Sequence, residues 1–387
     1  MRTDNSTLSW LLSHSDQSKV RLPGTDRAQD PTATMEMADR AARMVGITRV
    51  ADITWLDTIG IPTFQAIRPT SRTLAVSQGK GITPELARLS ATMEAVELWH
   101  AEQPMTPVMT APSRDVIGQL GYDVRDLPLS PPTVLHDGLP LDWVAGRSLI
   151  DGSETLIPME AVGFSLVRKT GWNPPAFFAS TNGLASGNTL VEAILHALYE
   201  VIERDAVSTA MAGGDKGVLV DPGTLGSTVV DELCGMLARA RVSLEVRSVP
   251  SATGLPCFLA RITCDDYPPA FMGFGCHLSS EIALTRAVTE AAQARLGYIS
   301  GARDDLHSDI HNAPDPRRRP APAADTGEPI PKLTAHESLV DDLEDVVKRA
   351  AVAFSNAPLV ADLALDEIGV PVVKVVAPGS RVSPEVF

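Results

Sequence analysis

The 387 residues include 44% hydrophobic and 21% charged residues, enough to bury a core of good size, as in ordinary globular proteins. The formal net charge of −15 argues against nonspecific binding to nucleic acid or to an anionic membrane, because both need a basic surface on the protein. No run of about 18 apolar residues is present, so we expect no membrane span.

The cysteines also narrow the class of protein. Their spacing includes no C-x-x-C pair, which argues against a zinc knuckle or a thioredoxin-like motif. With no signal sequence, we expect reduced thiols in a cytoplasmic protein. The four are Cys234, Cys257, Cys264 and Cys276.

The chain opens with about 30 polar residues that lack a sustained period, and these predict a flexible N-terminal segment, residues 1–30. From Pro31, apolar residues at helical spacing predict an amphipathic helix that ends at Gly46. Strands are expected at 50–54, 59–67 and 74–77, and the last leads into a Gly-Lys-Gly turn at 79–81.

A helix that ends in an E-x-x-E pair follows this turn. Its glutamates are Glu94 and Glu97. Lys80 in the turn either contacts phosphate or faces solvent, because its spacing is not that of a Walker A loop. His100 follows on the same helix, where a half-buried structural histidine is favoured over a functional one.

The second half of the chain repeats this pattern. Residues 103–150 are rich in proline and turn formers, and strands are expected at 143–146, 156–160 and 177–181. A glycine-containing turn at 183–187 then precedes a helix that carries Asn188, Glu192, Glu200 and Glu203 at i, i+4, i+12 and i+15. At about 100° per residue these side chains share a limited sector. The face is either a solvated acidic surface or a set of carboxylates that needs a divalent cation.

Aligning Glu94 with Glu200 also places Glu97 on Glu203 and a glycine turn before each helix. This internal similarity predicts two related strand–Gly loop–helix units that face one another. Four carboxylates would then meet across one cleft. Such a cluster suits Mg²⁺ ions that hold the phosphates of a nucleotide.

The rest of the chain supplies further alternating elements. Helices are expected at 229–240, 281–299 and 337–355, and strands at 244–248, 257–263 and 372–376. The proline-rich residues 311–332, with an arginine run at 317–319, predict a linker or loop. We therefore expect an α/β fold with mixed sheets, with the main domain at 31–310 and its last helix and strand at 333–387.

The glutamate motifs resemble those of one family. The pairing of S-x3-E-x2-E with N-x3-E-x7-E-x2-E-R, and a third segment IALTRAVTEAAQARL, resembles the YcaO family over residues from about 20 to about 305. The resemblance implies a YcaO-like fold around an ATP and Mg²⁺ cleft. It also implies that ATP activates a backbone amide of a ribosomal precursor peptide.

Site residues follow from the same resemblance. It implies that Glu94, Glu97, Glu200 and Glu203 are metal ligands and that, with Arg286, they form the catalytic set. Arg27 and Thr34 are the nearest matches to an early basic residue and a hydroxyl that reach the nucleotide. The implied nucleotide-binding residues are Arg27, Thr34, Lys80, Ser90, Asn188, Glu192, Arg204, Arg286, Glu290 and Gln293.

The C-terminus departs from the family pattern. Azoline-forming members often end in PxPxP, whereas this chain ends SRVSPEVF, with only Pro384 in that region. There is also no fused leader-peptide-binding module. We therefore expect a standalone or TfuA-associated type that works with a separate leader-binding or TfuA-like protein or recognises its peptide unaided, and a homodimer by resemblance.

The chemistry implied is cyclodehydration or a related reaction. A side chain, an amine or sulfide adds to a peptide carbonyl, the oxyanion attacks the γ-phosphate of ATP, and loss of phosphate leaves an azoline, a macroamidine or a thioamide. Two alternatives remain. One is an ATP-dependent amide ligase, and the other is a non-catalytic ATP-binding partner of a modifying enzyme.

Overall fold

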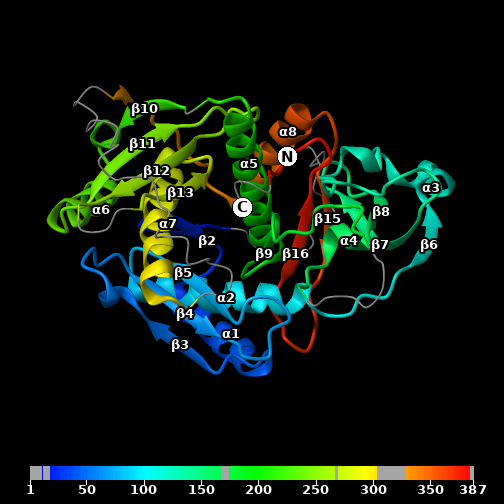
Figure 1. Ribbon diagram of the computed structural model, residues 1–387, viewed down its shortest axis with the longest axis horizontal. Helices are drawn as coiled ribbons and strands as arrows, with labels where there is room; N and C mark the ends of the chain where they lie inside the picture. The colour runs from blue at the N-terminus through cyan, green and yellow to red at the C-terminus, as the bar shows by residue number, and fades with distance from the viewer. Residues whose placement is uncertain are drawn as a thin grey trace, which may run out of the picture. The chain divides into compact units, whose positions relative to one another are not determined.

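Two compact units make up the chain in the computed structural model, and neither is continuous in sequence (Figure 1). Unit 1 combines Met1–Lys19, Val96–Ser208 and His336–Phe387, and unit 2 combines Val20–Ala95 and Thr209–Ala335. The unit boundaries fall inside the helices α2 (Pro84–Ala101) and α5 (Leu190–Ala212). The structure describes residues 11, 18–166, 174–215, 217–265, 269–302 and 327–383.

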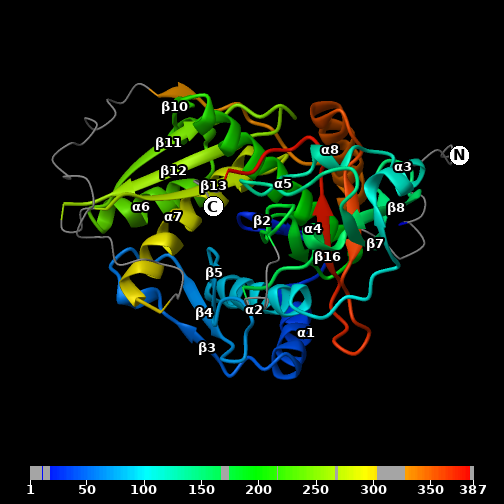
Figure 2. The same cartoon turned by 45° about the vertical axis from the view of Figure 1, so that its right-hand side comes forward.

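Unit 1 contains a six-stranded sheet in which all paired strands are antiparallel (Figure 2). The strand order is β6-β7-β15-β16-β9, and β8 also pairs with β7. Trp143 of β7 is fully buried in a core that also includes Phe177 and Ile157. The strands are β6 (Met109–Pro112), β7 (Pro140–Ser148), β8 (Glu154–Pro158), β9 (Leu184–Ser186), β15 (Leu359–Asp362) and β16 (Val372–Val376).

The helices of unit 1 include one turn-length segment and three longer helices. Two of them, α5 and α8, begin at 190 and 339, each with acidic residues in the first turn, where the helix dipole favours them. The helices are α3 (Ser113–Leu120), α4 (Met159–Val162), the part of α5 up to Ser208, and α8 (Leu339–Phe354).

Unit 2 contains a five-stranded sheet of order β13-β12-β11-β10-β14, a three-stranded sheet β3-β4-β5, and the hairpin β1-β2. Only the β10–β14 pair is parallel. The larger sheet packs against α7, and together with α6 they enclose a core that includes Phe258, Leu237 and Val288 (Figure 1).

The bounds of these elements follow the chain. The strands are β1 (Val20–Leu22), β2 (Thr25–Arg27), β3 (Arg49–Asp52), β4 (Thr63–Ile67), β5 (Val76–Lys80), β10 (Val218–Asp221), β11 (Ser243–Ser248), β12 (Cys257–Thr263), β13 (Phe271–Cys276) and β14 (Glu328–Pro329). The helices are α1 (Pro31–Met44), α6 (Thr228–Arg239) and α7 (Ser280–Ser300), and 3-10 turns lie at Thr54–Leu56, Val124–Asp126 and Pro222–Leu225.

A strand–Gly loop–helix arrangement occurs three times, as β5–α2, β9–α5 and β13–α7. In the first and third, the strand approaches the helix backbone so closely that only glycine fits. A Cβ on Gly79 would lie 1.9 Å from the backbone nitrogen of Ala91, and one on Gly275 would lie 2.0 Å from the carbonyl oxygen of Ala283. Glycine on the strand and alanine on the helix therefore permit this packing.

Several sequence predictions agree with these elements. The bounds of β12 and β16 are those predicted, and α1, α6, α7 and α8 lie where the helical patterns indicated. The predicted strand at 177–181 is wrong. Phe177 makes only an isolated bridge with Leu129, and the nearest strand is β9 at 184–186.

Two predicted irregular segments contain short strands. The hairpin β1-β2 lies within residues 1–30, and β14 lies within the predicted linker 311–332, whose residues up to 326 are outside the described residues. The arginine run 317–319 and Pro384 also lie outside them. In both cases the strand is two or three residues long, too short to produce a recognisable alternation of apolar residues.

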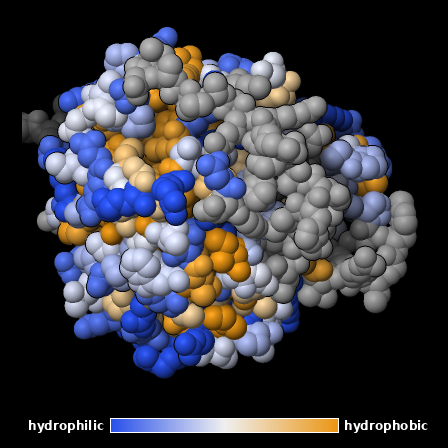
Figure 3. Space-filling model, turned by 60° about the vertical axis from the view of Figure 1, so that its left-hand side comes forward, coloured by the Kyte–Doolittle hydropathy of each residue, from blue (hydrophilic) through white to orange (hydrophobic). Residues whose placement is uncertain are grey.

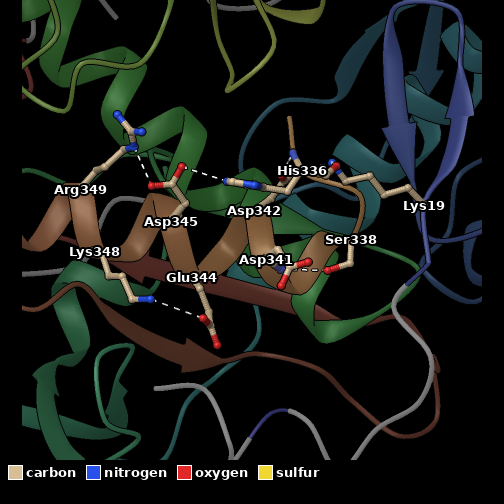
Figure 4. A network of polar contacts seen from close by, with 9 residues as sticks. All are labelled: Lys19, His336, Ser338, Asp341, Asp342, Glu344, Asp345, Lys348 and Arg349. Carbon is tan, nitrogen blue, oxygen red and sulfur yellow. Dashed lines mark hydrogen bonds and ion pairs between the residues drawn. The ribbon is translucent and has the colours of Figure 1, made fainter. Parts of the chain in front are cut away.

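A buried ion pair stabilises unit 1 (Figure 4). The Lys19 ammonium lies 2.5 Å from Asp342, and the two side chains are 1% and 0% exposed. Lys19 also donates to the carbonyl oxygen of His336, and the backbone N–H of His336 donates to Asp342. Each polar group of this network thus has a partner, so the burial of both charges is compensated.

The outer face in Figure 3 is mostly hydrophilic, with hydrophobic residues in small patches between the polar ones. Exposed apolar side chains such as Val218 and Met272 are scattered, which is ordinary for a protein surface. Among the described residues, the helices are too short or too polar to cross a membrane.

Candidate functional site

The first E-x-x-E pair lies near the end of α2. Glu94 and Glu97 are half-buried, and they belong to successive turns of the helix. The Glu97 carboxylate accepts hydrogen bonds from the backbone N–H and the hydroxyl of Ser186, at 2.8 and 2.6 Å. Ser186 ends β9, the strand of the second repeat. A glutamate of the first repeat is thereby held at the loop that begins the second.

The second acidic set lies on α5. Glu203 is 3% exposed and Glu192 is 2% exposed, while Glu200 lies 3.9 Å from Arg204 as an i, i+4 pair. Asn188 donates to Glu192 through both its backbone N–H and its side-chain amide. Glu192 therefore stabilises the first turn of α5 in the way of a capping box.

A buried lysine that the sequence analysis missed lies beside this set. Lys374 of β16 is 4% exposed, and its ammonium donates to the carbonyl oxygen of Ser180 at 2.6 Å. Burial lowers the pKa of Lys374 to about 8, and the negative charge of Glu200 acts in the opposite direction. A lysine inside the apolar run VVKVV of β16 is the signal that should have been noticed, because charged side chains rarely occupy buried strands.

In unit 2, a polar face forms on α7 beside β5. Arg286, Glu290 and Gln293 lie at i, i+4 and i+7 and share one side of the helix. The Lys80 ammonium is 2.5 Å from the Glu290 carboxylate, and both side chains are about one-fifth exposed (20% and 21%). The structure thus decides one alternative, because Lys80 pairs with α7 and does not merely face solvent.

Three polar atoms on this face, two on α7 and one on β5, are buried with no hydrogen-bond partner among the described residues. They are Arg286 Nε, Gln293 Oε1 and Gln78 Nε2. A buried donor or acceptor without a partner costs free energy. We name this set, Gln78, Lys80, Arg286, Glu290 and Gln293, the α7 polar face.

Two other predicted nucleotide contacts lie near the start of unit 2. Arg27 ends β2 and donates to the carbonyl oxygen of Asp26, and the Thr34 hydroxyl donates to the carbonyl oxygen of Asp30 at 3.1 Å. Thr34 is 9% exposed, and Ser90 is half-buried on α2. The roles of these three residues toward a nucleotide stay predictions.

His100 and the thiols have structural roles. His100 is 2% exposed and its Nδ1 lies 2.8 Å from the carbonyl oxygen of Val96, and burial lowers its pKa. His277 Nδ1 accepts from the backbone N–H of Ser279, so it does not form a catalytic pair with Cys276. All four cysteines are free thiols.

The last described residues run beside α5 in unit 1. The backbone N–H of Arg381 donates to Asp205 at 2.8 Å, and that of Ser383 donates to the Ser208 hydroxyl at 3.0 Å. Burial raises the pKa of Asp205, and the bond from Arg381 opposes this. The tail is therefore anchored on the helix that carries Glu200 and Glu203.

These residues suit Mg²⁺ and a nucleotide. Among the described residues, no three carboxylate, imidazole or thiolate groups cluster as an all-protein metal site would require. Mg²⁺ does not need one, since it is usually held by one or two carboxylates together with phosphate oxygens. The carboxylates of α2 and α5 supply such ligands, and the unpartnered atoms of the α7 polar face suit a polar ligand.

Comparison with known proteins agrees with these features. A family model described as "YcaO cyclodehydratase, ATP-ad Mg2+-binding" matches residues 78–381. An uncharacterised protein of Mycobacterium tuberculosis is 39% identical over 92% of this chain and 82% of its own length. An uncharacterised protein in the tfuA 3′ region of Rhizobium leguminosarum bv. trifolii is 36% identical over 75% of this chain and 71% of its own.

Solved structures share the fold. YcaO from Methanopyrus kandleri, bound with AMPPCP and Mg²⁺, matches with a TM-score of 0.76 and 25% identity over 94% of this chain and 95% of that one. A heterocyclase in complex with substrate and cofactor matches with a TM-score of 0.80 and 22% identity over 95% of this chain and 54% of that one. The chain therefore belongs to the YcaO family, as an ATP-dependent peptide-modifying enzyme with ATP and Mg²⁺ as its cofactors.

Proposed function

We propose that this protein activates a backbone amide of a ribosomally made precursor peptide by phosphorylating the amide oxygen with ATP. The α7 polar face carries the proposal, because it combines two cationic side chains with buried polar atoms that have no partner among the described residues. Such a face favours a polyanionic nucleotide. The family membership supports the same chemistry.

The residues divide into two roles. Glu94, Glu97, Glu200 and Glu203 would hold Mg²⁺, which neutralises phosphate charge when bound. Arg286 and Lys80 would bind phosphate oxygens, with Glu290 holding the Lys80 ammonium in place. The remaining nucleotide contacts proposed are Arg27, Thr34, Ser90, Asn188, Glu192, Arg204 and Gln293.

The reaction begins when a nucleophile adds to the carbonyl carbon of the peptide and leaves a negative charge on its oxygen. That oxygen attacks the γ-phosphorus of ATP, the bond to the β–γ bridging oxygen breaks, and ADP leaves. The amide oxygen then departs as part of inorganic phosphate, and loss of a proton completes the new bond. The side chains of the chain contribute by positioning and by charge neutralisation, with no covalent enzyme intermediate.

The nucleophile determines the product. A Cys, Ser or Thr side chain gives an azoline, a peptide amine gives a macroamidine, and sulfide gives a thioamide. The relative encoded in a tfuA 3′ region supports a TfuA-like partner, and we propose that the protein acts with one or with a separate leader-binding protein, as a homodimer.

The test is ATP turnover with Mg²⁺ and the candidate precursor peptide, with the peptide mass followed in parallel. A loss of about 18 Da indicates cyclodehydration and a gain of about 16 Da with sulfide indicates thioamidation, because oxygen leaves as phosphate in each. Glu200→Gln should abolish both signals. Glu344→Gln is the matched control, since Glu344 pairs with Lys348 on the surface of α8.

A TfuA-like protein is added in a second series. If ATP binds but neither turns over nor changes the peptide mass in any mixture, the protein is a non-catalytic partner. If a peptide carboxylate is coupled to an amine instead, the amide-ligase alternative replaces the proposal.

A further inference from the structure

A small cavity in unit 1 places Lys374 opposite an unpartnered amide. Its volume is about 30 Å³, and its polar lining includes Lys374, Asn182, Ser180 and Ser380. The walls are apolar and include Phe178. A cavity of this size holds a small polar group or one or two waters.

The hydrogen-bonding capacity of the cavity is not used within the chain. Lys374 carries three N–H donors when charged, and one donates to the carbonyl oxygen of Ser180 at 2.6 Å. The Oδ1 atom of Asn182 is buried and has no hydrogen-bond partner among the described residues. The cavity thus presents spare donors on one side chain and a spare acceptor on another.

A donor beside an acceptor complements a peptide group, whose carbonyl oxygen accepts and whose N–H donates. The acceptor oxygen of Asn182 disfavours phosphate and carboxylate, because these anions have no hydrogen to give it. The volume also excludes a nucleotide. Glu200 lies near enough for its charge to act on Lys374, so the cavity adjoins the α5 carboxylates.

We propose that this cavity is a subsite for a backbone peptide group of the substrate, with Lys374 donating to the carbonyl oxygen and Asn182 accepting from the N–H. The inference rests on the proposed function, since it assigns the peptide a place within unit 1. Recognition through the backbone would position the peptide without selecting its side chains. Lys374 and Asn182 are therefore positioning residues for the peptide.

The binding test needs neither ATP nor turnover. The protein is labelled with heavy nitrogen in its lysine side chains, and the Lys374 ammonium resonance is assigned with Lys374→Arg. Millimolar N-acetylglycine N-methylamide should shift this resonance, and the methyl ester, which lacks the second N–H, should shift it less. The proposal is wrong if the amide causes no shift, as when only water occupies the cavity, or if inorganic phosphate shifts it more than the amide does.

Kinetics give a second, independent readout. Asn182→Leu removes the acceptor and should raise the KM for the peptide about tenfold or more, with little change in the KM for ATP, because only peptide binding loses a hydrogen bond. Lys374→Met should act in the same direction. Lys348→Met, on the exposed face of α8, is the control.

The outcomes separate this inference from the proposed function. If the small amide binds but the precursor peptide is never modified, the subsite stands and the proposed reaction fails. If the peptide is modified and Asn182→Leu leaves its KM unchanged, the reaction stands and the subsite is refuted. Because Asn182 is in a turn outside the regular strands, this variant should fold even where Lys374→Met does not.

Discussion

Two polar regions of the molecule differ in how completely their groups are paired. In the Lys19–Asp342 network both charges are buried and hydrogen-bonded to each other and to His336. On the α7 polar face, the Lys80–Glu290 pair is partly exposed and the buried Arg286 Nε has no partner among the described residues. A complete network stabilises a fold, whereas an incomplete one leaves binding capacity for a ligand.

Breaking the complete network should cost the most stability. Lys19→Met leaves the Asp342 carboxylate buried without its cation, so we expect the free energy of unfolding to fall by about 3–5 kcal/mol, measured by urea denaturation. The rate of ATP use by the folded fraction should not change. Lys348→Met removes an exposed i, i+4 pair of α8 and should cost about 0.5 kcal/mol or less. Equal losses in the two variants would contradict the comparison.

Breaking the incomplete face should have the opposite result. Arg286→Gln removes a cation proposed to meet developing phosphate charge, so kcat for ATP use should fall about 10²- to 10³-fold, with little change in the free energy of unfolding. Steady-state kinetics and denaturation are measured on the same preparation. Arg349→Gln, on the surface of α8, serves as control, and a large loss of stability in Arg286→Gln would place Arg286 with the structural residues.

The α7 polar face also depends on a close backbone contact in the strand that carries Lys80. A Cβ on Gly79 would lie 1.9 Å from the backbone nitrogen of Ala91, so Gly79→Ala should cost about 1–3 kcal/mol of stability and lower ATP use as β5 shifts. Gly118 in α3 has nothing within 4 Å of such a Cβ. Gly118→Ala should be neutral or should stabilise by about 0.5–1 kcal/mol, and thermal melts compare the two variants.

The smallest effect concerns Asp345, at the exposed end of the Lys19–Asp342 network (Figure 4). Burial raises the pKa of this carboxyl, but bonds from Arg349 and His336 outweigh it, and the net pKa is lowered. Its ionised form therefore stabilises the fold above the usual pKa of 3.8, and this contribution is lost as the pH falls through the lower folded pKa. Asp345→Asn should cost about 0.5 kcal/mol at neutral pH and nothing in strong acid. A constant difference across the pH range would refute this assignment.

The sequence was sufficient to predict regular elements with strong periodicity. The apolar alternation of β12 and the N-caps and apolar faces of α7 are local signals, and both elements lie where predicted. The strand β13, FMGFGC, was missed because its two glycines weaken the strand pattern. Those glycines are present for tertiary reasons, since each approaches the backbone of α7.

The candidate site was predicted as residue types but not as contacts. The glutamate motifs, with Arg286 and Gln293, were found from spacing and resemblance, because each motif lies on one helix. The Lys80–Glu290 pair joins residues 210 positions apart, and Asn182 gains meaning only from the cavity that it lines with Lys374. Such long-range contacts have no local pattern in the sequence.

The central claim is that the amide oxygen of the peptide leaves as part of phosphate, and heavy oxygen tests it most directly. A precursor peptide labelled with heavy oxygen in its backbone carbonyls is converted with ATP and Mg²⁺ in ordinary water, and the released phosphate is analysed by mass spectrometry. The account predicts one heavy oxygen in phosphate for each modification made. Phosphate that carries only oxygen from water or ATP, while the peptide is modified, would contradict it.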